Sequence, residues 1–151
     1  MKKFIVCLFL IAGSLFLFCA CGDKTPATPQ EFQSVMESYG YQFVDISDQY
    51  EAGYTAYLAV APDSSYQIEY YQLPSADLAL QAYTVNRDDF DSQKGDTNTV
   101  VETNGANSAK YALSTAGTYY FVSYIQNTMV YITAPDTFKD QIKEAIEELG
   151  Y

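Results

Sequence analysis

Hydrophobic positions recur with a helical period in three parts of the chain after residue 28, and with a period of two between those parts. The first helix is expected over residues 29–39, where one face carries Phe32, Val35, Met36 and Tyr39. Thr28-Pro29-Gln30-Glu31 has the sequence of a capping box with proline at the first helical position, and Gly40 ends the helix.

Strict alternation of apolar and polar side chains follows this helix. It predicts three strands, over residues 42–46, 54–61 and 65–73. Pro62-Asp63-Ser64 separates the last two strands and is typical of a β-turn, so these strands should form a hairpin.

The remaining chain predicts two more helices and four more strands. A helix is expected from Ser75 through Val85, with Phe90 as a further apolar position, and it should end in an acidic loop over residues 88–96. Asn104-Gly105 is a strong hairpin signal. The expected strands and final helix cover residues 99–103, 109–114, 119–125, 129–134 and 136–149.

This order of elements predicts one α+β domain, with a single largely antiparallel sheet of six or seven strands and three helices packed on it. Most links between strands are too short for crossover connections, which favours antiparallel pairing. The first and last helices share a Pro-x-x-Phe start at Pro29 and Pro135 and a Gly-Tyr end. Two explanations are open: the two helices use the same start and stop residues, or a β-β-β-α unit was duplicated.

The first twenty residues have the pattern of an export signal. Lys2 and Lys3 precede an apolar run over residues 4–18. A permanent membrane helix is the alternative, but spanning a bilayer needs about 20 apolar residues and this run is shorter.

The end of the apolar run, Leu17-Phe18-Cys19-Ala20-Cys21-Gly22, resembles the lipobox of bacterial lipoproteins, although Phe18 and Cys19 depart from its usual residues. The resemblance implies that Cys21 receives a diacylglyceryl thioether and that the signal is removed before it. It further implies a signal peptide at 1–20, a lipidated tether at 21–28 and a domain at 29–151. The domain would then lie on the outer face of the cytoplasmic membrane, and a plain signal anchor is the alternative.

Cysteine and charge restrict the chemistry of the exported part. Cys7, Cys19 and Cys21 are the only cysteines, so removal of the signal leaves a single thiol that the lipid would occupy, and no disulfide. Six basic and 19 acidic residues remain after Cys21, a formal charge of −13. Such a surface repels nucleic acid and anionic lipid headgroups, so nucleic acid is not expected as a partner.

The chain contains no histidine, which excludes imidazole metal sites and Ser-His relays. The acidic cluster of Asp88, Asp89, Asp91 and Asp96 fails as a calcium loop, because Lys94 stands where glycine is required and Val100 where glutamate is required. No cofactor motif is present, so neither a cofactor nor a metal is expected.

The 15 tyrosines are the remaining signal. Alternation places one set of strand residues on a core face beneath the helices: Leu58, Val60, Tyr66, Ile68, Tyr70, Tyr111 and Leu113. It places a second set on the opposite face, where Gln67 and Ser114 accompany six candidate binding residues: Tyr57, Glu69, Tyr71, Lys110, Tyr120 and Tyr124. Tyrosine suits a recognition surface because it combines flat contact area with a hydroxyl. The alternative is that tyrosine simply favours half-buried strands.

The mature part is similar to small cysteine-free lipoproteins of Gram-positive bacteria, a resemblance that conveys no activity. We therefore expect a non-catalytic binding or accessory module that contacts an envelope protein or polymer. A ligand-binding sensor subunit would be favoured by an enclosed apolar cavity between sheet and helices. A carboxylate-based hydrolase, using Glu69 or the acidic loop, would be favoured by a deep pocket in which two carboxyl groups have a raised pKa.

Overall fold

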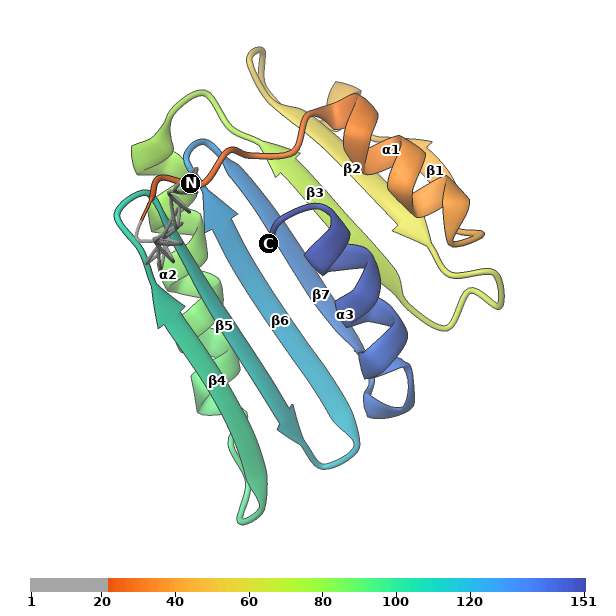
Figure 1. Ribbon diagram of the computed structural model, residues 1–151, viewed down its shortest axis with the longest axis vertical. Helices are drawn as coiled ribbons and strands as arrows, with labels where there is room; N and C mark the ends of the chain where they lie inside the picture. Colours follow the sequence, from red (N-terminus) through yellow and green to blue (C-terminus); the bar gives the residue numbers. More distant parts are fainter. Residues whose placement is uncertain (1–21) are drawn as a thin grey trace, which may run out of the picture.

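A computed structural model describes residues 22–151, so the expected signal peptide and Cys21 lie outside the described residues (Figure 1). Seven strands form one antiparallel sheet in the order β1-β2-β3-β7-β6-β5-β4, which confirms the expected α+β architecture. The elements are α1 (Pro29–Ser38), β1 (Gln42–Asp45), the 3₁₀ turn η1 (Ser47–Gln49), β2 (Thr55–Val60), β3 (Gln67–Gln72), α2 (Ala76–Ser92), β4 (Asn98–Asn104), β5 (Ser108–Thr115), β6 (Thr118–Ile125), β7 (Thr128–Pro135), the 3₁₀ turn η2 (Asp136–Phe138) and α3 (Lys139–Glu148).

Helix α1 begins and ends as its sequence predicts. The Thr28 hydroxyl accepts a hydrogen bond from the Glu31 N–H at 3.2 Å, and the Glu31 carboxylate accepts one from the Thr28 N–H at 2.7 Å. This reciprocal pair satisfies two backbone donors that a helix start leaves unpaired. Gly40 follows the helix with φ of +82°, a left-handed conformation that glycine adopts without strain.

The last strand enters the middle of the sheet. β7 pairs with β3 on one side and with β6 on the other, and it joins the first three strands to the meander of β4 to β7. Helix α2 carries the chain from β3 to the far edge at β4. It continues to Ser92, further than expected, so Asp88, Asp89 and Asp91 lie on its last turns instead of in a loop.

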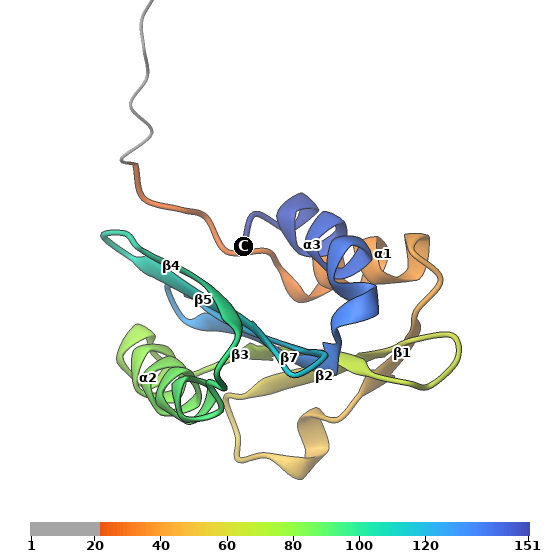
Figure 2. The same ribbon diagram turned by 90° about the horizontal axis from the view of Figure 1, so that it is seen from below.

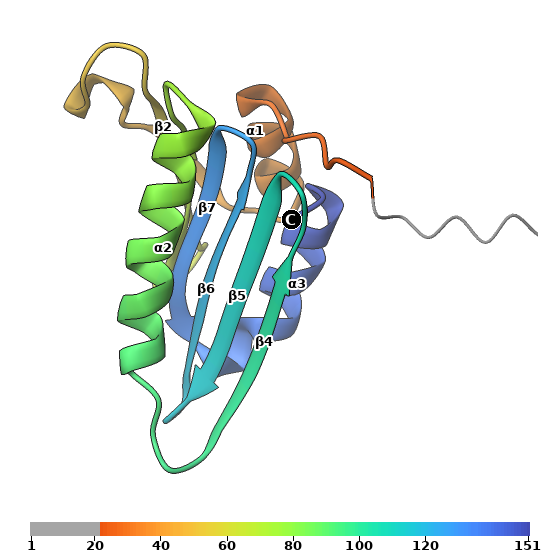
Figure 3. The same ribbon diagram turned by 90° about the vertical axis from the view of Figure 1, so that its left-hand side faces the viewer.

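The helices cover both faces of the sheet, which corrects the expectation of one face beneath the helices and one open face. Helices α1 and α3 lie on one side and α2 lies on the other (Figures 2 and 3). We refer to these as the α1/α3 face and the α2 face.

The expected division of strand residues between faces is wrong because the expected register between strands is one residue off. Residues paired across a ladder share a face. Leu58 pairs with Glu69, which in turn pairs with Tyr131. Leu58 and Leu113 therefore lie on the α2 face, whereas Ile68 lies on the α1/α3 face.

Each face has its own hydrophobic cluster. On the α1/α3 face, Phe32 of α1 is fully buried and stacks on Tyr70 with ring centroids 4.9 Å apart. On the α2 face, Phe90 packs between Tyr120 and Tyr131, with centroids 5.0 and 5.1 Å away. Helices α1 and α2 are thus held by aromatic contacts with the strands, whereas α3 packs through Ile142, Ala145 and Ile146.

Candidate functional site

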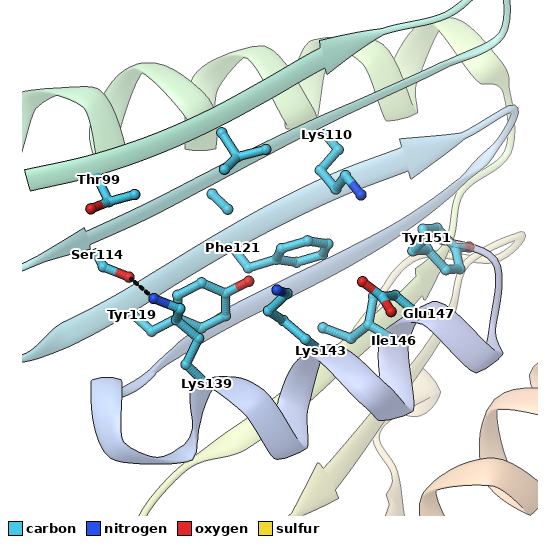
Figure 4. A pocket seen from close by; sticks show the side chains of 12 residues that line it. Thr99, Lys110, Ser114, Tyr119, Phe121, Lys139, Lys143, Ile146, Glu147 and Tyr151 are labelled. Atoms are coloured by element: carbon cyan, nitrogen blue, oxygen red, sulfur yellow. Dashed lines mark hydrogen bonds between the residues drawn. The ribbon is translucent and has the colours of Figure 1, made fainter.

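A groove of about 350 Å³ lies on the α1/α3 face between α3 and strands β4, β5 and β6 (Figure 4). Cross-strand pairing forms its floor, because Val101, Ala112 and Phe121 lie side by side on three neighbouring strands. Ser114 and Tyr119 form the next row of the same floor. No helix covers the β4 side of this face (Figure 2).

Lysine side chains surround the groove, and we call it the lysine groove. Lys139 and Lys143 stand four residues apart on α3 and line one wall, while Lys110 of β5 lines the other side (Figure 4). These are three of the six basic residues that follow Cys21. Glu147 is the one acidic residue of the lining.

The ammonium groups of the lysine groove are only weakly engaged by the protein itself. The Lys139 ammonium donates to the Ser114 hydroxyl at 3.3 Å and lies 3.9 Å from a carboxylate oxygen of Asp136. Lys110 and Lys143 form no ion pair with another residue of the described chain. Their charges are therefore available to an anion that enters the groove.

Buried aromatic side chains provide the apolar part of the lining. Phe121, Tyr119 and Tyr151 are each 3% exposed. Burial raises the pKa of the Tyr119 and Tyr151 phenols, so both stay neutral at physiological pH. The Tyr151 hydroxyl is hydrogen-bonded to Thr128. The groove thus combines a neutral aromatic floor with a cationic rim.

The N-terminal segment contributes a fourth lysine beside the groove. Burial and the nearby charge of Lys110 lower the pKa of Lys24. The Lys24 ammonium donates to the Gly150 carbonyl at 2.9 Å, beyond the end of α3. Its backbone N–H and C=O bond to the Asn107 side chain at 3.0 and 2.8 Å, and Gln126 also donates to the carbonyl. From Lys24 onward the expected tether therefore lies on the domain.

The six tyrosine-face candidates do not form one surface, which corrects the sequence expectation. Lys110 lines the lysine groove, and Tyr57 shares its face. Tyr57 nevertheless lies four strands away, packed on Phe43 and Tyr70 at 4.6 and 6.3 Å.

The other four candidates lie on the α2 face, where they separate into two pairs. Tyr120 and Tyr124 are half-buried beneath α2, and Tyr124 lies 5.2 Å from Tyr83. Glu69 and Tyr71 remain beside α2 and line a second groove. Covering by α2 therefore removes the first pair from any open recognition surface.

Sequence reasoning missed Lys139 and Lys143. Their spacing of four residues on the last helix, in a domain so poor in basic residues, was a detectable signal of one cationic helix face. Their approach to Lys110 was not detectable, because it depends on which sheet face α3 covers.

The carboxyl groups with clearly shifted pKa values are Glu31, Asp45, Asp63 and Asp91. All four pKa values are lowered, chiefly by hydrogen bonds from Thr28, Ser47, Ser65 and Lys94 respectively. They remain ionised and lack the raised pKa that a general acid requires.

Two further features bear on the expected chemistry and location. Within residues 22–151, no three histidine, cysteine or acidic side chains gather as metal ligands would. Every helix in this range is too short or too polar to span a bilayer.

Comparisons with protein-family models, with curated proteins and with solved structures give no match for this chain.

Proposed function

We propose that the protein is a lipid-anchored extracytoplasmic binding module, held on the outer face of the cytoplasmic membrane through Cys21, and that its lysine groove binds an amphiphilic anion. The observation that carries the proposal is the gathering of Lys110, Lys139 and Lys143 around one aromatic floor, in a chain with a formal charge of −13 after Cys21.

Charge complementarity supports an anionic ligand. Elsewhere the acidic surface repels anions, so the lysine groove is a local region of opposite potential. Like charges placed close together cost free energy, and the charge of Lys110 adds to burial in lowering the pKa of Lys24. A bound anion would reduce the repulsion between the lysine ammonium groups of the groove.

The floor of the groove supports a ligand with an apolar part. Binding sites for small molecules are mostly apolar, with a few polar groups that fix orientation. Val101 and Ala112 provide such a surface, since Val101 is 50% exposed and Ala112 is half-buried, and the buried ring of Phe121 lies beside them. A small inorganic anion would leave this surface in contact with water, whereas an amphiphile would cover it.

The fixed N-terminal segment supports a site close to the membrane. Gly22 and Asp23 are the described residues between Cys21 and the anchored Lys24. Three steps along the backbone span at most about 11 Å. A lipid on Cys21 would therefore hold Lys24 near the lipid headgroups. Lys110, which lies beside Lys24 and lines one side of the lysine groove, would then also lie near them.

The alternatives to a binding module have less support. A carboxylate-based hydrolase at Glu69 or in the acidic segment requires two cooperating carboxyl groups, one with a raised pKa. Glu69 is the one acidic residue that lines its groove, and the pKa of Asp91 in the acidic segment is lowered. A sensor with an enclosed apolar cavity fits poorly with a groove that opens along β4.

Binding of a fluorescent anion tests the groove. Anilinonaphthalene sulfonate has an aromatic body and one negative charge, and N-phenylnaphthylamine is its uncharged counterpart. We expect the Lys110→Gln, Lys143→Gln double variant to bind the sulfonate about tenfold more weakly, because two partly exposed charge contacts contribute roughly 1–2 kcal/mol. Affinity for the uncharged dye should not change.

The matched control is Lys94→Gln, since Lys94 pairs with Asp91 outside the groove and should leave both affinities unchanged. Equal losses for both dyes in the double variant, or no loss of sulfonate binding, would refute the anion site.

Anchoring is tested separately by Cys21→Ala in a bacterium that processes lipoproteins. We expect the wild-type protein to carry a lipid mass on an N-terminal Cys21 and to sediment with membranes, and the variant to lose both properties. A wild-type protein that still begins at Met1 would instead favour a signal anchor.

A further inference from the structure

A second groove, of about 510 Å³, lies on the α2 face, where one side of α2 meets β3, β7 and the segment that carries Tyr50 and Tyr54. Four tyrosines and one carboxylate are prominent in its lining: Tyr50, Tyr54, Glu69, Tyr71 and Tyr131. We call it the tyrosine groove. It lies on the opposite face from the lysine groove, so a ligand bound there would be independent of the proposed function.

The tyrosine rings come from three separate parts of the chain. Tyr50 stacks on Tyr54 at a centroid distance of 6.1 Å and meets Tyr71 edge-on at 5.8 Å, with interplanar angles of 25° and 76°. Tyr131 of β7 is the cross-strand partner of Glu69 of β3. These four rings therefore line one groove together with the Glu69 carboxylate.

Two hydrogen bonds hold the Glu69 side chain in place. The Tyr71 hydroxyl donates to one carboxylate oxygen, and the Gln67 amide donates to the other at 2.7 Å. Burial and the bond to Glu69 raise the pKa of Tyr71, so Tyr71 remains a neutral donor. Glu69 forms no ion pair with another residue in the range 22–151. A half-buried negative charge thus lacks a positive partner.

The tyrosine rings and the Glu69 carboxylate both favour binding of a cation. The faces of aromatic rings carry negative potential and attract cations, most strongly where water is partly excluded. A half-buried carboxylate gains further from a positive charge nearby.

The hydrogen bonds already made to Glu69 narrow the choice of cation. A primary ammonium must find acceptors for three N–H donors, whereas Tyr71 and Gln67 occupy part of the acceptor capacity of Glu69. A quaternary ammonium has no N–H to satisfy, and its methyl groups pack well on ring faces. We propose that the tyrosine groove binds a quaternary ammonium group of the choline type.

Calorimetric titration of the purified protein with choline tests this proposal. The neutral control ligand is the carbon isostere of choline, in which carbon replaces the charged nitrogen. We expect choline to bind about tenfold more tightly than this isostere, because the difference reports the charge alone. Glu69→Gln should remove most of that ratio, and Tyr50→Leu should weaken choline binding.

Three controls test whether a change in choline binding arises in the tyrosine groove, from a folding defect or from binding in the lysine groove. Tyr71→Phe keeps the ring but removes the bond to Glu69, and we expect it to retain measurable choline binding. The Lys110→Gln, Lys143→Gln variant should bind choline as the wild type does. Thermal unfolding of each variant checks that it is folded.

Equal affinity for choline and its isostere would overturn the proposal, as would an unchanged ratio in a folded Glu69→Gln variant. Failure of the lysine groove to bind the sulfonate dye would leave these outcomes unaffected, so the two ideas fail independently.

Discussion

The lysine groove and the tyrosine groove lie on opposite faces of the sheet. On the α1/α3 face the open region lies over β4 to β6, and on the α2 face it lies beside β3 and β7. Seven strands spaced about 4.8 Å apart make a sheet roughly 29 Å wide, whereas a helix covers about 10 Å. Three helices shared between two faces must leave gaps, and here the gaps differ in charge.

The buried tyrosines also distinguish the two faces. On the α1/α3 face, Tyr70 donates to the Ala27 carbonyl at 2.8 Å, and the Tyr41 and Tyr66 hydroxyls bond to each other at 2.6 Å. Beneath α2, the buried Tyr83 hydroxyl has no hydrogen-bond partner among the described residues. Both faces add hydrogen bonds to ring packing, since on the α2 face the Tyr111 hydroxyl donates to Asp91 of α2 at 2.8 Å. The unpartnered hydroxyl of Tyr83 is what distinguishes the α2 face.

The largest expected effect is that of Phe90→Ala. Phe90 is 1% exposed and joins α2 to the strands through Tyr120 and Tyr131. Its truncation should lower the free energy of unfolding by about 3–5 kcal/mol, the usual cost of removing a buried ring. Urea unfolding followed by circular dichroism measures this loss.

The control for Phe90→Ala is Val85→Ala, since Val85 lies on the same helix but is 69% exposed. It should change stability by less than about 0.5 kcal/mol. A similarly small effect of Phe90→Ala would mean that α2 is only loosely attached and that the sheet has one core instead of two.

A smaller loss is expected for Tyr70→Phe on the other face. The ring stays in place, but the Ala27 carbonyl loses its donor, and one of the bonds that hold the N-terminal segment on the domain disappears. We expect a loss of about 1–2 kcal/mol in urea unfolding. An unchanged midpoint would show that this hydroxyl does not contribute to holding the segment.

The same substitution on the α2 face should have the opposite sign. Burial raises the pKa of Tyr83 to about 12, so its hydroxyl stays protonated while lacking a partner. Tyr83→Phe removes an unsatisfied polar group and should raise the free energy of unfolding by up to about 1 kcal/mol. Equal destabilisation by Tyr83→Phe and Tyr70→Phe would contradict the unpartnered state of the Tyr83 hydroxyl.

The architecture is predictable from sequence where local signals dominate. The capping box at Thr28, the turn at Pro62 and the alternation within each strand all act between near neighbours. These signals predict the order of elements and the antiparallel pairing. They place the end of α2 too early, because the acidic residues at 88–91 have the composition of a loop, although Arg87 and Lys94 pair with two of them.

The candidate site is less predictable because it depends on long-range register. Alternation fixes faces within one strand, but a shift of one residue between strands exchanges the faces. The register expected from the sequence places Tyr57, Lys110, Tyr71 and Tyr124 on one face. In the structure, Tyr57 and Lys110 lie on one face and Tyr71 and Tyr124 on the other. Which face each helix covers is likewise not encoded in any local pattern.

The smallest expected effect concerns pH and compares the starts of α1 and α2. Hydrogen bonds from Thr28 hold the pKa of Glu31 below its usual value, whereas α2 is capped by Ser75, whose hydroxyl accepts from the Leu78 N–H and does not titrate in acid. A depressed carboxyl pKa stabilises the fold above the usual glutamate value near about 4.3, and that stabilisation is lost as pH falls through the lowered pKa. Glu31→Gln should therefore lower the melting temperature at pH 7, and its difference from the wild type should shrink steadily toward about pH 3.

Ser75→Ala provides the comparison for that pH series. Loss of this cap should cost about 1 kcal/mol at both ends of the range, because neither the serine hydroxyl nor the backbone N–H changes its charge. Melting curves for the three proteins at matched ionic strength separate the two behaviours. If Glu31→Gln lowered the melting temperature by the same amount at every pH, the negative charge of Glu31 would not contribute to stability. The start of α1 would then be no more acid-sensitive than that of α2.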